Sequence, residues 1–236
     1  MNKKLFLIPL VALSLAFSGE CVVCIDVGHS NGAPGATSAT GITEYLYNKR
    51  ASIDLFYALK AKGGISPFFS NPDEKRIKLG DRVKNAKAGG ADVFVSMHHD
   101  SVKEKFLKKW KINGKTRYYC DKFRGFGVFI SPKNPQFKES LSLAKYVGSN
   151  LVSSGFIPST YHSMDTKGER KKMYSKKHGI YRYDNLVVLK RSSMPAILIE
   201  NGVILNREEE ANLNDESYRS SLIDSIANGI EQWCRK

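Results

Sequence analysis

Short apolar runs that alternate with amphipathic helical patterns constrain the fold of this 236-residue chain most strongly. Residues 22–26 and 92–97 are nearly continuous apolar runs of strand length, as expected for strands buried on both faces of a sheet. Helical patterns over residues 44–62 and 137–153 follow strand-like runs and end at or near glycines. This alternation predicts a single α/β domain with three layers, in which helices flank a central sheet.

The remaining elements complete the domain, which we expect to span residues 22–236. Further strands are predicted at residues 66–69, 127–131, 186–190 and 196–200, and further helices at 74–88, 207–213 and 218–233. Two connections, 102–124 and 158–183, are too long for simple joints, and we interpret them as insertions. The first contains Asn113-Gly114, a strong short-range signal for a β-hairpin.

The N-terminus has the pattern of a cleavable signal peptide. Residues 1–18 contain Lys3 and Lys4, then an apolar run, then small residues. Because Pro9 interrupts that run, and because it is shorter than the roughly 20 residues that cross a bilayer, we expect no stable transmembrane anchor. Glu20 disfavours lipid attachment at Cys21, since lipoprotein processing requires a small residue at that place. The pattern therefore predicts an exported protein of the periplasm or cell envelope.

The cysteines of an exported chain meet an oxidising compartment. Two disulfides with three connectivities can be drawn among Cys21, Cys24, Cys120 and Cys234, and the sequence leaves the pairing open. Buried thiols, or one bridge near the two ends of the chain, are favoured over a zinc site, because the Cys21-x-x-Cys24 pair has no second such pair.

The formal net charge of +14 comes largely from two basic stretches. Residues 103–124 hold nine basic side chains and residues 167–177 hold six. Such runs usually form solvated faces. Behind a signal peptide, the expected polyanions are carboxylate-bearing polymers of the envelope, and nucleic acid is not expected as a partner. The aromatic side chains of the first stretch either stack on sugar rings or pack within the insertion: Trp110, Tyr118, Tyr119 and Phe123.

Three of the predicted strands end at residue types that commonly serve as metal ligands. His29 and His98 follow two apolar runs, and Glu200 ends a third. The carboxyl ends of strands in an open α/β sheet face one crevice, so we expect these residues to meet. Glu44, on the first turn of a helix, brings the set to two imidazoles and two carboxylates. This inventory suits a catalytic zinc site with three protein ligands and a carboxylate base, which can hydrolyse an amide.

Three segments resemble the signature blocks of the zinc-dependent N-acetylmuramoyl-L-alanine amidase family. They are IDVGHSNGAPGA with the spacing Gly41-x-x-Glu44-x-x-x-Asn48, then VFVSMHHDS, then MPAILIENGVILNREEEANL. Their order and spacing agree with the family from about Val22 to Trp233, apart from the two long connections. The resemblance implies a mixed, mostly parallel six-stranded sheet. It also implies hydrolysis of the amide between N-acetylmuramic acid and L-alanine of the stem peptide in peptidoglycan.

The same resemblance implies roles for individual residues. His29, Glu44 and His98 would be the Zn²⁺ ligands, and Glu200 would be the catalytic base. His98 is the expected ligand, rather than His99, because it directly follows the apolar strand. His99 is then expected on the other side of the strand end. The further candidates for substrate contact are Asn48, His99, His162 and His178.

The chain departs from the family pattern at a few positions. Val27 stands where the family usually has proline, Ser30-Asn31 where it often has glycines, and Asp100 where asparagine is common. These differences change loop shape and leave the ligand set intact.

Two alternative functions stay open on the sequence alone. One is a peptidoglycan-binding relative without activity, which the complete ligand and base set argues against. The other is a zinc peptidase that acts within the stem peptide. The sequence also leaves open the oligomeric state, the physiological role, and whether the second insertion occludes the site until a regulatory protein partner moves it.

Overall fold

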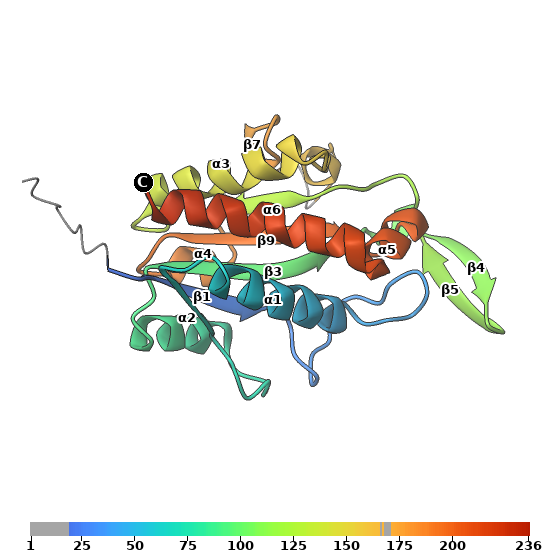
Figure 1. The fold of residues 1–236 in the computed structure, drawn as a ribbon. Helices are drawn as coiled ribbons and strands as arrows, with labels where there is room; N and C mark the ends of the chain where they lie inside the picture. The colour runs from blue at the N-terminus through green and yellow to red at the C-terminus, as the bar shows by residue number, and fades with distance from the viewer. Residues whose placement is uncertain (1–18, 166, 168–170) are drawn as a thin grey trace, which may run out of the picture.

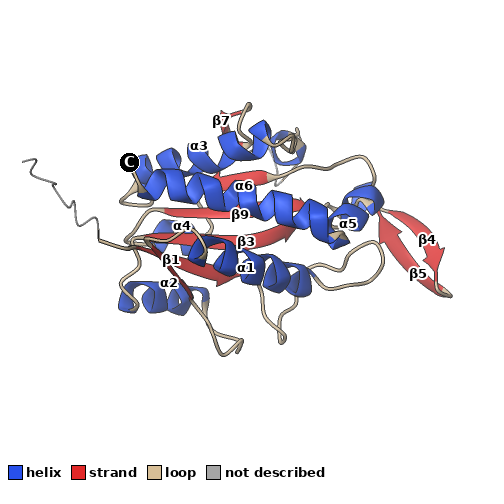
Figure 2. Ribbon diagram, in the orientation of Figure 1, coloured by secondary structure: helices blue, strands red, loops and turns tan. Residues whose placement is uncertain are grey.

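A computed structural model describes residues 19–165, 167 and 171–236 of the chain. The predicted signal peptide, residues 1–18, lies outside the described residues. Figures 1 and 2 show a central sheet flanked by helices, which confirms the predicted three-layer α/β architecture. No helix within the described ranges is both long and apolar enough to cross a membrane.

The central sheet has seven strands in the order β2-β1-β3-β9-β6-β8-β7. The strands are β1 (Cys21–Val27), β2 (Ile65–Phe69), β3 (Val93–Asp100), β6 (Gly127–Ile130), β7 (Met173–Ser175), β8 (Ile180–Arg182) and β9 (Ala196–Val203). β1 pairs in parallel with β2 and β3, and β3 with β9, whereas β6 runs antiparallel to β9. β8 is parallel to β6, and β7 is antiparallel to β8. The sheet is therefore mixed, as predicted, but it has seven strands instead of six.

The difference in strand number comes from the second predicted insertion. β7 and β8 both lie within residues 158–183 and extend the sheet past β6. The predicted strand at 186–190 is wrong, because Val187–Arg191 forms the short helix α4. A short apolar run fits a strand or a buried helical turn equally well. Here Val188 and Leu189 point into the core beneath one face of the sheet.

Three long helices cover one face of the sheet: α1 (Glu44–Lys60), α3 (Phe137–Ser153) and α6 (Glu216–Cys234). α2 (Leu79–Ala88) and α4 cover the other face. α2 begins five residues later than predicted. Glu74 has a positive φ of 57° that an α-helix does not admit, and Lys78, the N-cap of α2, is extended. There Glu74 accepts a hydrogen bond from the Tyr45 hydroxyl and pairs with Lys49.

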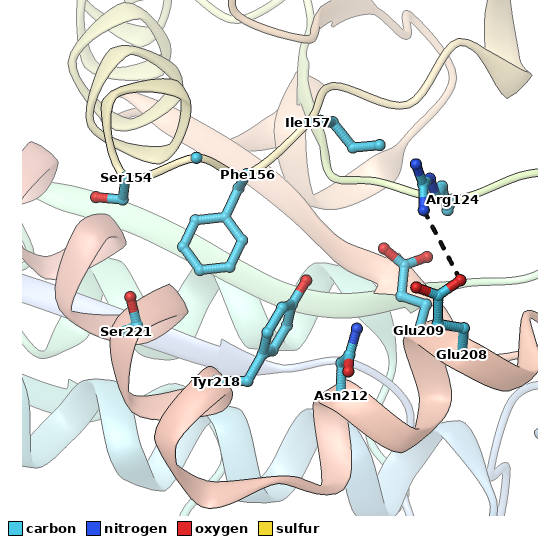
Figure 3. A pocket seen from close by; sticks show the side chains of 10 residues that line it. Arg124, Ser154, Phe156, Ile157, Glu208, Glu209, Asn212, Tyr218 and Ser221 are labelled. Atoms are coloured by element: carbon cyan, nitrogen blue, oxygen red, sulfur yellow. Dashed lines mark ion pairs between the residues drawn. The ribbon is translucent and has the colours of Figure 1, made fainter.

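One carboxylate ties the short helix α5 (Arg207–Asn214) to the end of β9 and to the loop that contains Gly125. Glu209, on its first turn, is 6% exposed and accepts hydrogen bonds from the backbone N–H groups of Gly125 and Val203, both at 2.7 Å. Figure 3 shows it beside Arg124 and Glu208. All three residues line a hollow of about 470 Å³. Burial raises the pKa of Glu209 to about 7, although these backbone bonds and Arg124 oppose the shift.

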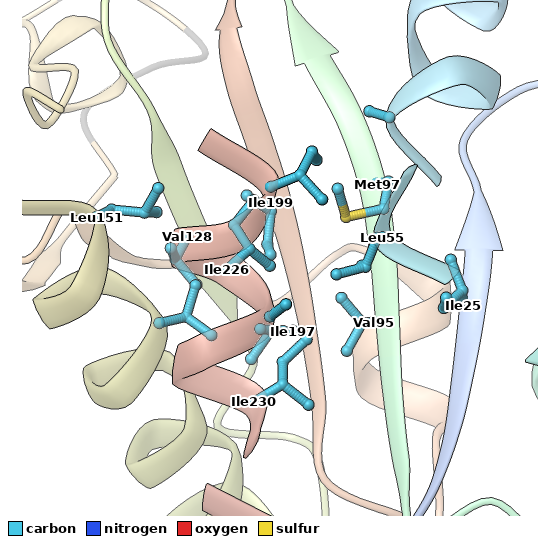
Figure 4. Packing of buried hydrophobic residues seen from close by; sticks show 14 of the residues in the cluster. Ile25, Leu55, Val95, Met97, Val128, Leu151, Ile197, Ile199, Ile226 and Ile230 are labelled. Carbon is cyan, nitrogen blue, oxygen red and sulfur yellow. The ribbon is translucent and has the colours of Figure 1, made fainter. Parts of the chain in front are cut away.

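Two apolar cores follow from the alternation of side chains along the strands. Val95, Met97 and Ile199 face α1 and α6, where they meet residues such as Leu55 and Ile226 (Figure 4). The residues between them in the strands face α2 and α4: Cys24, Phe94, Ala196 and Leu198. Because both faces are apolar, the strands are the nearly continuous apolar runs seen in the sequence.

The predicted hairpin is present in the first insertion. β4 (Lys108–Ile112) and β5 (Lys115–Tyr119) pair antiparallel around Asn113 and Gly114, which both have a positive φ. Figure 1 shows the hairpin extending beyond the body of the sheet, and the 3₁₀ turn Glu104–Phe106 precedes it.

A disulfide joins Cys21, at the start of β1, to Cys234, the last residue of α6. It closes a loop with a sequence separation of 213 residues. Cys24 and Cys120 are buried free thiols. Of the alternatives left open by the sequence, one bridge near the chain ends with two buried thiols is therefore the arrangement found.

Replacing Cys21 and Cys234 together by serine should lower the free energy of unfolding by about 2–5 kcal/mol, because the bridge restricts the unfolded chain. Urea unfolding of oxidised protein and of the double variant measures the loss. Dithiothreitol should destabilise the parent and leave the variant unchanged. Equal unfolding midpoints for parent and variant would contradict a formed bridge.

Glu209 should make stability fall as the pH rises from about 4.5 to 7. With a raised pKa in the folded state, the native protein keeps a proton that the unfolded chain has lost, so deprotonation costs stability on the order of 3 kcal/mol across this window. Glu209→Gln removes this component. As the pH rises, the unfolding free energy of the variant should therefore increase relative to that of the parent. Parallel pH profiles from urea unfolding would show that folding does not raise the pKa of Glu209. Asp100 and Arg124, the other charged groups that act on Glu209, are unchanged in the comparison.

Candidate metal centre

His29, Glu44 and His98 come together at the carboxyl ends of β1 and β3. The Glu44 Oε1 atom lies 3.0 Å from His29 Nε2 and 3.1 Å from His98 Nδ1. One ligand atom from each residue lies within 4.8 Å of the others, so the three could hold one metal ion. The structure therefore brings together the three residues predicted as ligands.

Two glycines make this close approach possible. At Gly28, an added Cβ would lie 2.5 Å from the imidazole of His98. At Gly35, which has a positive φ of 77°, an added Cβ would lie 2.5 Å from Glu44 Oε2 and 2.7 Å from the His29 ring. His29 itself has a positive φ of 68°, which is uncommon for a residue other than glycine. The loop after β1 is thus shaped around the three side chains.

The Glu44 carboxylate is ionised although it is only 5% exposed. Burial alone would raise the pKa of this carboxyl, but hydrogen bonds with His29 and His98, together with their charges, hold its pKa well below the ordinary value. Its place on the first residue of α1 adds the favourable field of a helix N-terminus. The Ala36 N–H also donates to Oε2 at 3.2 Å.

Glu200 lies beside this cluster, because β9 pairs with β3 so that Glu200 is opposite His98. Its Oε2 atom is buried and has no hydrogen-bond partner among the described residues. Burial, with the charges of Asp100 and Glu44, raises the pKa of Glu200 well above its ordinary value. A carboxyl with a raised pKa and an unpartnered oxygen is suited to exchange a proton with a reacting group.

The donor set fits a divalent transition metal such as zinc. Two imidazole nitrogens and one carboxylate oxygen are ligands that zinc accepts, and three protein ligands are typical of a catalytic zinc site. The hydrogen-bonded imidazoles and the ionised carboxylate already converge on one point. The buried, unpartnered oxygen of Glu200 supplies the polar group that such a site needs beside its ligands.

Asn48 and His99 lie behind the ligands and contact each other. Asn48 is fully buried and donates to Glu44 Oε1 at 3.2 Å and to the carbonyl of Gly28 at 3.1 Å. Its Oδ1 atom lies 2.8 Å from His99 Nδ1. His99 points to the opposite side of β3 from His98, as predicted, and burial lowers the pKa of its imidazole to about 3. Both side chains support the ligands from within the protein.

The two histidines of the second insertion occupy different places. His162 Nε2 lies 2.7 Å from Asp100 Oδ2, which also contributes to the raised pKa of Glu200. Asp100, one of the departures from the family pattern, is therefore paired with a histidine from the insertion. His178 instead lies against Gly148 of α3 and contacts the Ser175 hydroxyl at 3.1 Å, so it does not join the cluster.

A buried ion pair that was not predicted from the sequence lies under the metal cluster. Arg82 and Asp26 are 4% and 1% exposed, and Arg82 Nη1 lies 2.8 Å from Asp26 Oδ1. Arg82 also donates to the backbone carbonyls of Val27 and His29. Asp26 could have indicated this pair from the sequence, because a charge inside an apolar strand needs a partner.

The aromatic residues of the first insertion are mostly packed. Trp110 donates its indole N–H to the carbonyl of Ala39, and Arg207 lies 3.9 Å from the ring centroid of Tyr119. Phe123 is 6% exposed, whereas Tyr118 is 47% exposed. Of the four, Tyr118 is the one open to stacking on a sugar ring.

Comparison with known proteins places this geometry in a family. The sequence profile described as N-acetylmuramoyl-L-alanine amidase matches residues 23–232. The N-acetylmuramoyl-L-alanine amidase AmiC of Neisseria meningitidis is 26% identical over 234 residues, which cover 90% of this chain and 52% of AmiC. The chain thus spans about half the length of that relative.

Solved structures share the fold. The N-acetylmuramoyl-L-alanine amidase of Clostridium difficile 630 is 27% identical with a TM-score of 0.70, and the match covers 91% of this chain and 97% of that one. The CwlD amidase of Clostridioides difficile, solved in complex with the GerS lipoprotein, has a TM-score of 0.64 at 19% identity and covers 90% of this chain and 97% of its own. The match of the family profile along nearly the whole described chain shows that this protein belongs to the N-acetylmuramoyl-L-alanine amidase family.

Proposed function

We propose that this protein is an exported zinc hydrolase that cleaves the amide bond between N-acetylmuramic acid and L-alanine of the stem peptide in peptidoglycan. The observation that carries the proposal is the convergence of His29, Glu44 and His98 beside the unpartnered Oε2 atom of Glu200. Family membership supports the reaction class.

In this proposal three side chains bind the metal and a fourth transfers protons. His29, Glu44 and His98 hold zinc, which when bound supplies Lewis acidity that acidifies water and polarises a carbonyl. Glu200 takes the proton of the attacking water at Oε2 and passes it to the nitrogen that leaves. The raised pKa makes the ionised Glu200 a stronger base, and the positive charge of bound zinc would favour that ionised form. Asn48 and His99 position Glu44 instead of contacting substrate.

Export to the periplasm or cell envelope is part of the proposal. The Cys21–Cys234 disulfide supports it, because such bridges persist in oxidising compartments. The basic stretch of the first insertion suits an anionic wall polymer. A regulatory protein partner is also proposed, with the CwlD–GerS complex as the precedent in a protein of the same fold.

The role of Glu200 is tested by Glu200→Gln. This change should lower kcat/KM on purified peptidoglycan by about 10²–10⁴-fold, with zinc content unchanged, because it removes the proton acceptor and keeps the ligands. His98→Ala should instead lose zinc. Glu139→Gln, on the exposed surface of α3, is the matched control and should retain both.

Mass analysis of the released fragments identifies the bond cut. Free stem peptides that begin with alanine support the amidase. Shortened stems still attached to glycan would instead show a peptidase, and binding without any cleavage would show a non-catalytic relative. Wild-type release by Glu200→Gln would remove Glu200 from the mechanism.

Arg82 should position the turn that carries His29. Arg82→Lys keeps the charge opposite Asp26 but cannot reach both carbonyls of Val27 and His29, so zinc affinity should fall about 10–100-fold, as for other groups that orient metal ligands. Competition with a chelator measures the affinity, and circular dichroism checks the fold. Arg191→Lys, on the exposed end of α4, is the control. Unchanged zinc affinity in Arg82→Lys would contradict the positioning role.

A further inference from the structure

A small cavity of about 260 Å³ opens beside the metal cluster, with His29 and His98 in its wall. Much of the rest of its lining is aliphatic: Ile77, Leu79, Leu186, Val187, Val188 and Leu198. Leu79, on the first turn of α2, is 51% exposed. The cavity thus offers apolar surface to a ligand held at the metal centre.

Arg76 provides an uncompensated positive charge at this cavity. Its side chain packs over the turn after His29, with Cβ and Cδ 3.7 Å from where a Cβ on Gly32 would lie. The nearby acids are already engaged, Glu74 with Lys49 and Asp73 with Lys75. Arg76 is exposed and has no ion pair with any residue in the described ranges.

The other charged groups of the lining do not cancel this charge. Arg82 and Asp26 lie deeper in the wall and neutralise each other as a buried pair. Arg76 is therefore the group left to meet an anion that enters the cavity. A guanidinium binds a carboxylate through two parallel hydrogen bonds, which adds geometric selection to the charge.

We propose that this cavity is a subsite for the residue that follows the alanine in the stem peptide, and that Arg76 selects a free carboxylate on it. The proposal rests on the proposed function. Apolar pockets with one or a few well-placed polar groups commonly set ligand orientation and specificity. The aliphatic wall would hold the carbon chain of that residue, and Arg76 its carboxylate, within reach of the bond at the metal centre.

The test uses two synthetic muramoyl peptides that differ in one group, a free or an amidated α-carboxyl on the residue after the alanine. The parent enzyme should favour the free acid by about tenfold or more in kcat/KM, as expected for a hydrogen-bonded charge pair. Arg76→Gln should remove this preference by lowering activity on the acid alone. Arg76→Lys should keep part of it. Lys87→Gln, at an exposed lysine in the last turn of α2, leaves the Lys75–Asp73 pair in place and should keep all of it.

A second variant checks the cavity independently of Arg76. Leu79→Asp places a carboxylate in the lining and should lower activity on the acid peptide more than on the amide, because like charges repel. Thermal unfolding confirms that each variant is folded. Cleavage of both peptides with equal effects of the variants on each would overturn the subsite. Cleavage of neither peptide by the parent enzyme would instead overturn the proposed function.

Discussion

Parallel pairing of β1, β3 and β9 is the constraint on which the rest of this structure depends. It places His29, His98 and Glu200 at one edge of the sheet, and the register sets His98 directly opposite Glu200. The loop after β1 then returns Glu44 to the same point at the start of α1. Residues separated by as many as 171 positions become neighbours, because the apolar faces of the strands are buried between two layers of helices.

The site contains two carboxyl groups whose pKa values are shifted in opposite directions. The two histidines hold the pKa of Glu44 well below its ordinary value. Glu200 lies opposite His98, and burial and the charges of Asp100 and Glu44 raise its pKa. Carboxyls whose environments push their pKa values apart can serve as ligand and proton carrier within one site. The family profile and the geometry therefore point in the same direction, from independent observations.

Long elements with a strong pattern, and the meeting of the strand ends, were predictable from the sequence, whereas short elements and individual side-chain partners were not. The α3 helix begins and ends where its periodicity predicts, and the residues that form the metal cluster were identified from apolar runs and their resemblance to a family. The strands β7 and β8 are too short to carry a periodic signal, and the run at 186–190 was wrongly predicted as a strand. Asp26 could be recognised as a charge in an apolar strand. Its partner Arg82 lies 56 positions away, and nothing in the residues around Arg82 indicates that it is buried or paired.

The disulfide between β1 and α6 also determines what a single proteolytic cut can do to the protein. It joins the first strand of the domain to its last helix, so the described chain between them is a covalently closed ring. A protease that cuts one exposed loop would leave the two pieces linked and still packed around the same core. Such a ring tolerates a single cut that would separate an open chain into two fragments.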